Sequence, residues 1–423
     1  MAPYIRLRPH WPDEPIVQNL TDTDFYKFPM GQFIFNHFNG VKVAFGLKNR
    51  TLTVPLAKVI PETRLREELD HVRTLRFNNT ELHYLRGTNE YQLRMFREPY
   101  LEFLKSYIPP SYELEYRGDE IVLEFPGAWT ESSPWEIYGL EIINELYFRE
   151  LLKQRSIFDK DVLFAEGKKH LWEKIQILKK NPRIMFSEFG TRRRFSRDWQ
   201  DYVVAALAEE LPPEQFRGTS NTYLAQKYGL LPMGTNAHEL QMAIAGLMQG
   251  TDEELRSSQS SMLGLWWQEY GESLSIFLPD TFGTESFLKL VTPEMLQQWK
   301  GFRQDSGDPI AEGDMWIKAY QAAGVDPTKK MMIASDGLDI EAMLAIEKHF
   351  RGRLMVSFGW GTNLTNDLGL KTLSLVIKAR TANGISLVKL SNNPAKAMGD
   401  REAVKRYMRV FGYSEHASTE CRY

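Results

Sequence analysis

A chain of 423 residues is too long for one small domain, so its length predicts two or three folding units. Hydrophobic residues at 43% and charged residues at 25% are typical of a globular protein. The formal net charge of −3 gives no support to a general role on nucleic acid or at a membrane surface, and we expect neither as a partner.

The number of cysteines and the composition of the N-terminal residues indicate in which cellular compartment the protein is expected. The only cysteine is Cys421, so neither an internal disulfide nor a cysteine metal cluster is expected. Residues 1–20 hold prolines and charges but no apolar signal core, and no apolar run approaches the length of a membrane span. We therefore expect a cytoplasmic protein.

The first part of the chain mixes helical and strand-like patterns. We expect helices over residues 30–38, 61–77, 89–107, 135–153 and 161–180, a strand over 41–47, and a hairpin of 112–115 with 121–125. Asp22 and Asp24 precede the first helix and can cap it, but Tyr26 and Lys27 add a ring and a cation that capping does not need. This part predicts a mixed α+β N-terminal domain over residues 1–155.

From Arg183 onward, a short apolar run repeatedly ends in a polar cluster and a helix follows. The runs are 184–189, 216, 230–233, 274–278, 302, 331–334 and 354–358. Seven strand-like runs that alternate with helices favour a parallel α/β fold, most simply an irregular TIM-like α/β barrel over residues 156–370. Because the polar clusters follow the strands, the active site is expected at the strands' carboxyl ends.

The last portion, residues 371–423, predicts a hairpin, a helix and a polar tail. Residues 373–381 and 385–390 flank Asn383-Gly384, which is a favoured hairpin turn pair. A helix is expected over 401–411. We expect this portion to pack back on the N-terminal domain.

The stretch Gly301 to Pro309 has the richest local chemistry. It combines one cation, Arg303, with the carboxylates of Asp305 and Asp308 around the flexible Gly307. Such a set suits hydroxyl groups, a metal-bound phosphate or a positively charged reaction centre. A plain turn with Asp308 as a helix N-cap before Pro309 is the alternative.

Other clusters indicate phosphate binding, whereas several familiar motifs are missing. Loops at 335–337 and 359–362 would offer backbone N–H groups and hydroxyls to a phosphate, although most such loops are plain turns. Residues 192–194 form a cation cluster, of which at least one member is expected to be solvated. The sequence has no Walker loop and no zincin histidine pair, and residues 218–222 lack the last glycine of a nucleophile elbow.

His238 stands where a strand end opens a helix. A lone histidine is more often structural than catalytic, but a carboxylate from the adjacent Glu239 would orient the imidazole and raise its nucleophilicity. The context favours a functional histidine.

Five motifs in the same order resemble those of the nicotinate phosphoribosyltransferase family. They are residues 22–27, 189–194, 218–221, 234–239 and 303–309, and the resemblance extends from about Leu20 to the Met398-Gly399-Asp400 region. The resemblance implies transfer of the phosphoribosyl group from phosphoribosyl pyrophosphate to nicotinate, giving nicotinate mononucleotide and pyrophosphate for NAD synthesis by salvage. It also implies a mixed N-terminal domain, an irregular α/β barrel, and a homodimer with shared active sites.

The resemblance also assigns roles to individual residues. ATP hydrolysis would be coupled through a phosphohistidine at His238, with Asp280, Glu239 and Asp305 as further catalytic residues. Phe189 would stack on the pyridine ring, with Tyr26 of the partner chain on its other face, and Ser220 would donate to the nicotinate carboxylate. Substrate anions, ribose hydroxyls and the 5-phosphate would be held by the remaining set, namely Arg192, Arg303, Asp305, Ser306, Gly307, Asp336, Gly337, Gly361 and Thr362. Mg²⁺ would bind through pyrophosphate oxygens, so no protein ligand to it is predicted.

Three other functions remain open. The first is the related reaction with nicotinamide, whose enzymes carry an aspartate at the position of Ser220. The second is a phosphosugar aldolase or isomerase, for which Lys378 is the strand-borne candidate for a Schiff base. The third is a metabolite sensor that keeps the fold without catalysis. Release of pyrophosphate only when nicotinate is present distinguishes the transferase from the other classes.

Overall fold

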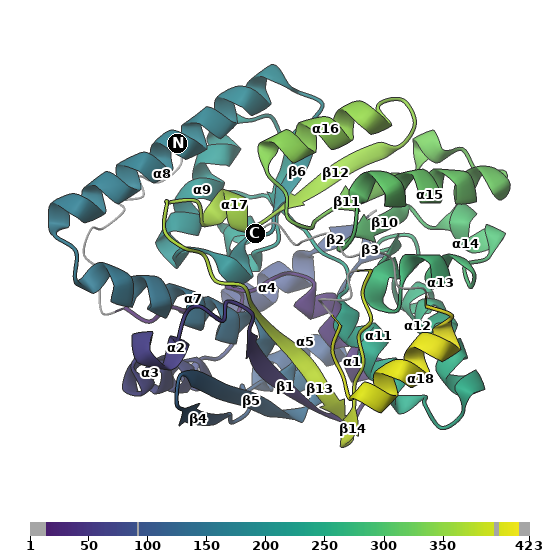
Figure 1. Cartoon of the computed structure of the whole chain (residues 1–423), viewed down its shortest axis with the longest axis horizontal. Helices are drawn as coiled ribbons and strands as arrows, with labels where there is room; N and C mark the ends of the chain where they lie inside the picture. The colour runs from purple at the N-terminus through teal and green to yellow at the C-terminus, as the bar shows by residue number, and fades with distance from the viewer. Residues whose placement is uncertain (1–13, 91–92, 393–396, 414–423) are drawn as a thin grey trace.

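The computed structural model shows two large sheets and one two-stranded sheet, joined by many helices (Figure 1). The structure describes residues 14–90, 93–392 and 397–413, so Cys421 lies outside the described residues. Within these ranges, no helix combines the length and apolar character needed to cross a membrane.

The seven predicted strands form one sheet in which every pair is parallel. Its strand order is β8-β7-β6-β12-β11-β10-β9, with bounds β6 Met185–Glu188, β7 Phe216–Thr219, β8 Leu231–Pro232, β9 Ile276–Phe277, β10 Gly301–Gln304, β11 Met331–Ala334 and β12 Met355–Trp360. The α/β prediction is thus confirmed. The described strands leave β8 and β9 at opposite ends of the order, so the sheet is an open, curled half-barrel instead of a closed TIM-like barrel.

Helices that precede or follow these strands cover the sheet (Figure 1). They are α8 Ile157–Lys180, α9 Arg197–Glu210, α10 Thr222–Tyr228, α11 His238–Leu247, α12 Asp252–Tyr270, α13 Thr284–Leu288, α14 Pro293–Gln298, α15 Pro309–Ala322, α16 Ile340–Phe350 and α17 Thr362–Thr365. The core between α15 and the sheet is aromatic, since the ring of Trp316 stacks on Phe302 with centroids 4.4 Å apart. Asp308 caps α15 by accepting from Ala311 N at 2.8 Å, as the plain-turn interpretation predicts for this one residue.

The second sheet is antiparallel and combines both ends of the chain. Its order is β14-β13-β1-β5-β4, with bounds β1 Lys42–Asn49, β4 Glu113–Arg117, β5 Glu120–Ala128, β13 Leu375–Ala382 and β14 Ile385–Ser386. The turn between β13 and β14 has positive φ at Asn383 and Gly384, as the turn pair predicts. Because β13 pairs with β1, the C-terminal hairpin packs on the N-terminal part as expected.

Helices surround this sheet, and one prediction here is wrong. They are α1 Lys27–His37, α2 Leu56–Val59, α3 Glu62–Thr74, α4 Asn79–Gly87, α5 Glu98–Ser106, α6 Trp129–Ser132 and α7 Trp135–Lys153. The single helix predicted over 89–107 is instead the strand pair β2 Asn89–Glu90 and β3 Leu93–Arg94 followed by α5. A capping box of Asn78 with Glu81 starts the unpredicted α4, and Pro99 marks the first turn of α5.

Helix α18 (Arg401–Phe411) does not pack where it was expected. Its apolar face lies against Phe282, whose ring stacks on Phe411 with centroids 4.5 Å apart. On its polar side, Arg406 Nε lies 2.9 Å from Asp252 of α12. The helix therefore packs on the part of the chain that carries the parallel sheet, and only the hairpin before it joins the N-terminal sheet.

Candidate active site

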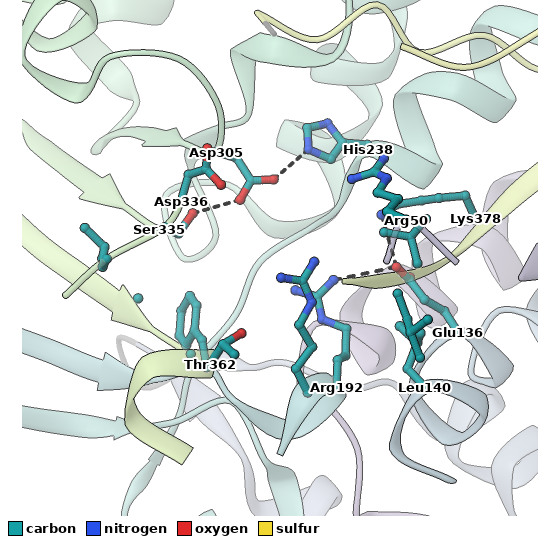
Figure 2. Close-up of a pocket in the computed structure, with 18 of the residues that line it drawn as sticks. Arg50, Glu136, Leu140, Arg192, His238, Asp305, Ser335, Asp336, Thr362 and Lys378 are labelled. Carbon is teal, nitrogen blue, oxygen red and sulfur yellow. Dashed lines mark hydrogen bonds and ion pairs between the residues drawn. The ribbon is translucent and has the colours of Figure 1, made fainter. Parts of the chain in front are cut away.

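One pocket lies at the carboxyl ends of the parallel strands. Nine predicted site residues line it, namely Phe189, Arg192, His238, Arg303, Asp305, Asp336, Gly337, Gly361 and Thr362. Most come from the segments that follow β6, β10, β11 and β12, whereas Arg303 lies on β10 itself and His238 begins the helix after β8. The antiparallel sheet and α7 close the other side through Lys378 and Glu136 (Figure 2).

His238 begins α11 and is held by three side chains. Its Nδ1 lies 2.8 Å from Thr281 Oγ1, while its Nε2 lies 2.7 Å from Asp305 Oδ2 and 3.0 Å from Lys389 Nζ. Thr281 donates its own hydroxyl hydrogen to Gln241 Oε1, so its oxygen accepts from Nδ1–H. With the hydrogen on Nδ1, Nε2 can accept from Lys389, whereas its contact with the Asp305 carboxylate needs a hydrogen on Nε2, so the two contacts correspond to different protonation states of His238. Burial lowers the pKa of His238 to about 4, and the Lys389 ammonium acts in the same direction against Asp280 and Asp305.

Asp280 and Asp305 face His238 as a pair of carboxylates. Burial opposes their ionisation, but His238 and Lys389 lower the pKa of Asp280, and Arg303 with His238 lowers the pKa of Asp305 well below its usual value. Ligand atoms of the two aspartates and His238 all lie within 4.8 Å of one another. Asp280 Oδ1 is buried without a hydrogen-bond partner, which suits an atom that awaits a cation. The residues present therefore fit Mg²⁺, with the aspartates as oxygen ligands.

The predicted role of Glu239 is wrong, because this carboxylate faces away from His238. Its Oε2 pairs with Lys27 Nζ at 2.6 Å, and its Oε1 accepts from Trp129 Nε1 at 2.7 Å. Neighbouring residues on a helix point in different directions, so Glu239 cannot share the partners of His238. Thr281, Asp305 and Lys389 orient the imidazole instead.

Phe189 and Arg192 form the opposite part of the pocket. A Cβ atom at Gly359 would lie 2.4 Å from the Phe189 ring, so only glycine lets this ring pack against the strand. Arg192 Nε lies 3.1 Å from Asp24 Oδ2, and its Nη1 lies 3.6 Å from Glu136 Oε1. The pocket therefore presents an aromatic face next to a held cation.

Tyr26 lies beside Arg192 of its own chain but is not among the residues that line the pocket. Its ring centroid is 5.8 Å from the Arg192 guanidinium, and its hydroxyl donates to Glu136 Oε2 at 3.2 Å. With 5% of its surface exposed, Tyr26 is packed inside the single chain. The chain's own Tyr26 therefore already places an aromatic ring next to Arg192, without a Tyr26 from a partner chain.

Ser220 does not face the pocket, unlike its predicted role. Its hydroxyl donates to Asp24 Oδ1 at 2.6 Å, and Asp24 in turn holds Arg192. Burial raises the pKa of Asp24, against the lowering effect of Arg192 and Ser220. Ser220 thus acts on Arg192 through Asp24. The proposed N-capping by Asp22 and Asp24 is also wrong, since α1 has no side-chain cap and Asp22 pairs with the buried Arg194.

The two glycine loops lie together on the third side of the pocket. Ser335 Oγ donates to Asp305 Oδ1 at 2.9 Å, which links the β11 loop to the catalytic candidates (Figure 2). Gly337 has φ of 59°, a conformation that favours glycine in this turn. From the β12 loop, Gly361 and Thr362 line the same pocket.

Asp280, Ser306 and Gly307 lie behind the surface of the pocket. Ser306 is buried and donates to Asp280 Oδ2 at 2.6 Å. Gly307 has φ of 83°, and its carbonyl accepts from Gln304 Nε2 at 3.0 Å, so it shapes the turn after β10. Ser306 and Gly307 therefore support the carboxylates and do not line the cavity that a substrate would enter.

Sequence reasoning missed several pocket residues or gave them other roles. Glu136 binds three cations, with Lys27 Nζ at 2.8 Å and Lys378 Nζ at 3.1 Å besides Arg192, and these cations overcome burial and lower its pKa. Lys378 lies on β13 of the antiparallel sheet, not on a barrel strand. Lys389 and Arg50 also line the pocket. None of these residues belongs to a recognised motif.

The fold and the pocket together define an α/β protein with an anion-binding site at the carboxyl edge of a parallel sheet. Cations, glycine loops and paired carboxylates surround one aromatic ring. Two family models identify the class further. The model described as the nicotinate phosphoribosyltransferase (NAPRTase) family matches residues 184–415, and that of the NAPRTase N-terminal domain matches residues 21–144. The chain belongs to the nicotinate phosphoribosyltransferase family.

Solved structures agree with this membership. A nicotinate phosphoribosyltransferase from Vibrio cholerae is 30% identical, with a TM-score of 0.85 and 96% of each chain covered. The nicotinate phosphoribosyltransferase from Porphyromonas gingivalis is 26% identical, with a TM-score of 0.83, and the match covers 94% of this chain and 100% of that one. A structure from Saccharomyces cerevisiae is 28% identical with a TM-score of 0.85, covering 95% of this chain and 100% of the other.

Proposed function

We propose that this protein transfers the phosphoribosyl group of phosphoribosyl pyrophosphate to nicotinate, coupled to ATP hydrolysis through a phosphohistidine at His238. The products are nicotinate mononucleotide and pyrophosphate, which place the enzyme in the salvage route to NAD. Membership of the family supports nicotinate as acceptor. The observation that carries the proposal is a pocket in which His238 and Asp305, with Asp280 buried behind them, face Phe189 and Arg192.

Nicotinate would bind between the aromatic and cationic groups of the pocket. Its ring would pack on Phe189, and its carboxylate would pair with Arg192, whose orientation depends on Asp24 and Glu136. A carboxylate in the ligand suits this cation better than a neutral carboxamide does, which favours nicotinate over nicotinamide. Tyr26 adds a second ring beside the same cation.

The phosphoribosyl donor would lie along the carboxylates and the glycine loops. Gly337, Gly361 and Thr362 would hold the 5-phosphate, Arg303 an anion of the donor, and Asp305 the ribose hydroxyls. Attack by the pyridine nitrogen on the anomeric carbon breaks the bond to pyrophosphate and builds positive charge on the sugar ring. Carboxylates fixed nearby stabilise that charge more in the transition state than in the ground state.

His238 is prepared for phosphoryl transfer. Its Nε2 would attack the γ-phosphorus of ATP, forming an N–P bond as the bond to the ADP oxygen breaks, and water would later hydrolyse the phosphoramidate to inorganic phosphate. The neutral state at ordinary pH and the Nδ1 contact to Thr281 support this role. Mg²⁺, held by Asp280 and Asp305, would neutralise phosphate oxygens. The phosphorylated and free states would differ in donor affinity, which couples ATP to synthesis.

The other candidate functions find less support. Lys378 pairs with Glu136 at 3.1 Å, so its ammonium is engaged as a cation instead of being prepared for a Schiff base. A non-catalytic sensor would not need Asp280, His238 and Asp305 held together around one imidazole. Assembly as a homodimer and a cytoplasmic location complete the proposal; the resemblance implies the first, and the second rests on sequence features alone.

The decisive experiment measures pyrophosphate release from phosphoribosyl pyrophosphate. Release is expected only when nicotinate is present, and ATP is expected to increase it. Nicotinamide in place of nicotinate should give a much lower rate. The proposed transferase would be refuted if pyrophosphate were released when both nicotinate and nicotinamide are absent. It would also be refuted if no pyrophosphate were released with nicotinate, ATP and Mg²⁺ present.

A further inference from the structure

Lys174 on α8 reaches the loop that follows β12, although α8 lies between the two segments matched by the family models. Its Nζ donates to the Asn363 carbonyl at 2.5 Å and to Asp367 Oδ2 at 2.6 Å. The ammonium also lies 5.5 Å from the ring centroid of Trp360, the residue before Gly361. Only 15% of the Lys174 side chain is exposed, so its ammonium group is packed against the protein and is not a solvated surface charge.

Asn363 connects the two glycine loops of the pocket. Its side-chain Nδ2 donates to the Leu338 carbonyl at 2.9 Å, and Leu338 directly follows Gly337. Asn363 and Leu338 both line the pocket, next to Thr362 and Gly337. A support that fixes the Asn363 backbone therefore fixes the separation of the two loops.

The β12 loop has little support of its own. Helix α17 has only four residues, and its N-cap is Gly361, which has no side chain that could cap the helix. A turn this short cannot hold its backbone rigidly, so its position depends on contacts from outside. Lys174 supplies such contacts, with a charge-assisted hydrogen bond to the loop carbonyl and a cation–π contact to Trp360.

We propose that Lys174 is a positioning residue for the phosphate group of the phosphoribosyl donor, acting through Asn363 on the loops of Gly337 and Gly361. The inference rests on the proposed function, because it takes these loops to hold the donor's 5-phosphate. Asp367 neutralises the Lys174 charge locally, so the effect is one of geometry and not of long-range attraction. The 5-phosphate is remote from the reacting carbon, so its contacts are made equally in the ground and transition states.

The test compares Lys174→Met with the wild type in steady-state kinetics. Because uniform binding is lost, KM for phosphoribosyl pyrophosphate should rise about tenfold, equal to about 1.4 kcal/mol, while kcat and KM for nicotinate stay within about twofold. Lys174→Arg should recover most of the affinity. The matched control is Lys169→Met on the same helix, which removes an exposed lysine paired with Glu173 and should change nothing.

Binding of inorganic phosphate by calorimetry separates this inference from the proposed function. Should the wild type make no nicotinate mononucleotide, the transferase proposal fails, yet phosphate should still bind about tenfold more weakly to Lys174→Met. A folded Lys174→Met enzyme with unchanged donor KM would overturn the role of Lys174. So would an equal loss in every kinetic parameter, because that marks a general structural defect. If Lys174→Met does not fold, Lys174→Gln, which keeps one donor, takes its place in the same measurements.

Discussion

The Nδ1 atom of His238 lies 2.8 Å from Thr281 Oγ1, and this contact determines which nitrogen faces the substrates. Thr281 is itself fixed by Gln241, so its hydroxyl oxygen can only accept. The pair therefore directs Nε2 toward Asp305 and Lys389, and a hydrogen on Nδ1 leaves Nε2 the lone pair that a nucleophilic imidazole requires.

The first prediction concerns this contact. Thr281→Val keeps the side-chain volume but removes the acceptor of Nδ1–H, so the tautomer with Nε2 as nucleophile loses its support. We expect ATP hydrolysis to fall about tenfold, the loss that about 1.4 kcal/mol produces, with ATP-independent transfer within about twofold of the wild type. Thr281→Ser retains the hydroxyl and should retain hydrolysis. Equal hydrolysis by the valine and serine variants would show that the contact is not needed.

The second prediction concerns phosphorylation of His238. His238→Asn should fold and keep slow, ATP-independent transfer, because Asp280 and Asp305 remain in place. It should lose ATP hydrolysis and the gain in donor affinity that ATP produces. Incubation with γ-labelled ATP and mapping of the acid-labile label checks this directly. Stoichiometric label on the asparagine variant would place the phosphate on another residue.

The third prediction concerns acid against amide. Ser220→Asp would bring a new carboxylate against the buried Asp24, whose nearest oxygen now lies 2.6 Å from the serine hydroxyl. Repulsion there would displace Asp24 and with it Arg192, so KM for nicotinate should rise more than tenfold. Ser220→Ala loses only one hydrogen bond, worth about 1 kcal/mol, so its KM for nicotinate should rise only about fivefold. The preference for nicotinate over nicotinamide is itself wrong if the unmodified enzyme uses both bases with equal catalytic efficiency.

The fourth prediction asks whether the site is shared between chains. Because Tyr26 lies beside Arg192 of its own chain, Tyr26→Ala should weaken nicotinate binding by about 1 kcal/mol through lost ring contacts. Light scattering is expected to show a homodimer. When Tyr26→Ala and Asp305→Ala chains are co-expressed with different tags, the purified mixed dimer should keep the raised KM for nicotinate of the Tyr26→Ala enzyme. A wild-type KM in the mixed dimer would mean that each site takes Tyr26 from the partner chain.

The fifth prediction concerns acid stability. Asp22 is buried, which disfavours its charge, but Arg194 and Arg197 more than compensate and lower its pKa from 3.8 to about 2. A depressed folded-state pKa contributes stability above pH 3.8 that is lost as the pH falls toward 2, here on the order of 2 kcal/mol. In urea unfolding, the stability difference between wild type and Asp22→Asn should therefore be smaller at pH 2.5 than at pH 7. A difference that does not change with pH would contradict the ion-pair account.

The sequence predicts the parallel strands well because each one is a short apolar run followed by polar residues. It does not reveal that the sheet stays open. That property depends on which strands pair, and strands as short as Leu231–Pro232 and Ile276–Phe277 carry almost no pairing signal. The prediction of a single helix over 89–107 failed for a related reason, because the two-residue strands Asn89–Glu90 and Leu93–Arg94 carry almost no pairing signal and Pro99 lies in the first turn of α5.

The sequence predicted the site residues that directly follow a parallel strand, but it did not predict those contributed by elements outside the parallel sheet. His238, Asp305 and Arg192 converge because the carboxyl ends of parallel strands share one edge. Glu239 was misassigned because adjacency in sequence does not mean adjacency around a helix. Glu136 lies within an amphipathic helix whose sequence reads as ordinary core, so only the packed structure shows its three cations.

The pairing of β13 with β1 has a consequence for synthesis of the chain. Strand β1 (Lys42–Asn49) leaves the ribosome long before β13 (Leu375–Ala382), so its unsatisfied edge must wait for almost the whole chain. Non-local pairing of this kind slows folding and exposes a template for association with other chains. Lys378 arrives on that same late strand, so a nascent chain cannot complete its pocket. A chain that ends before β13 would lack Lys378 in its pocket and would leave this edge of β1 unpaired.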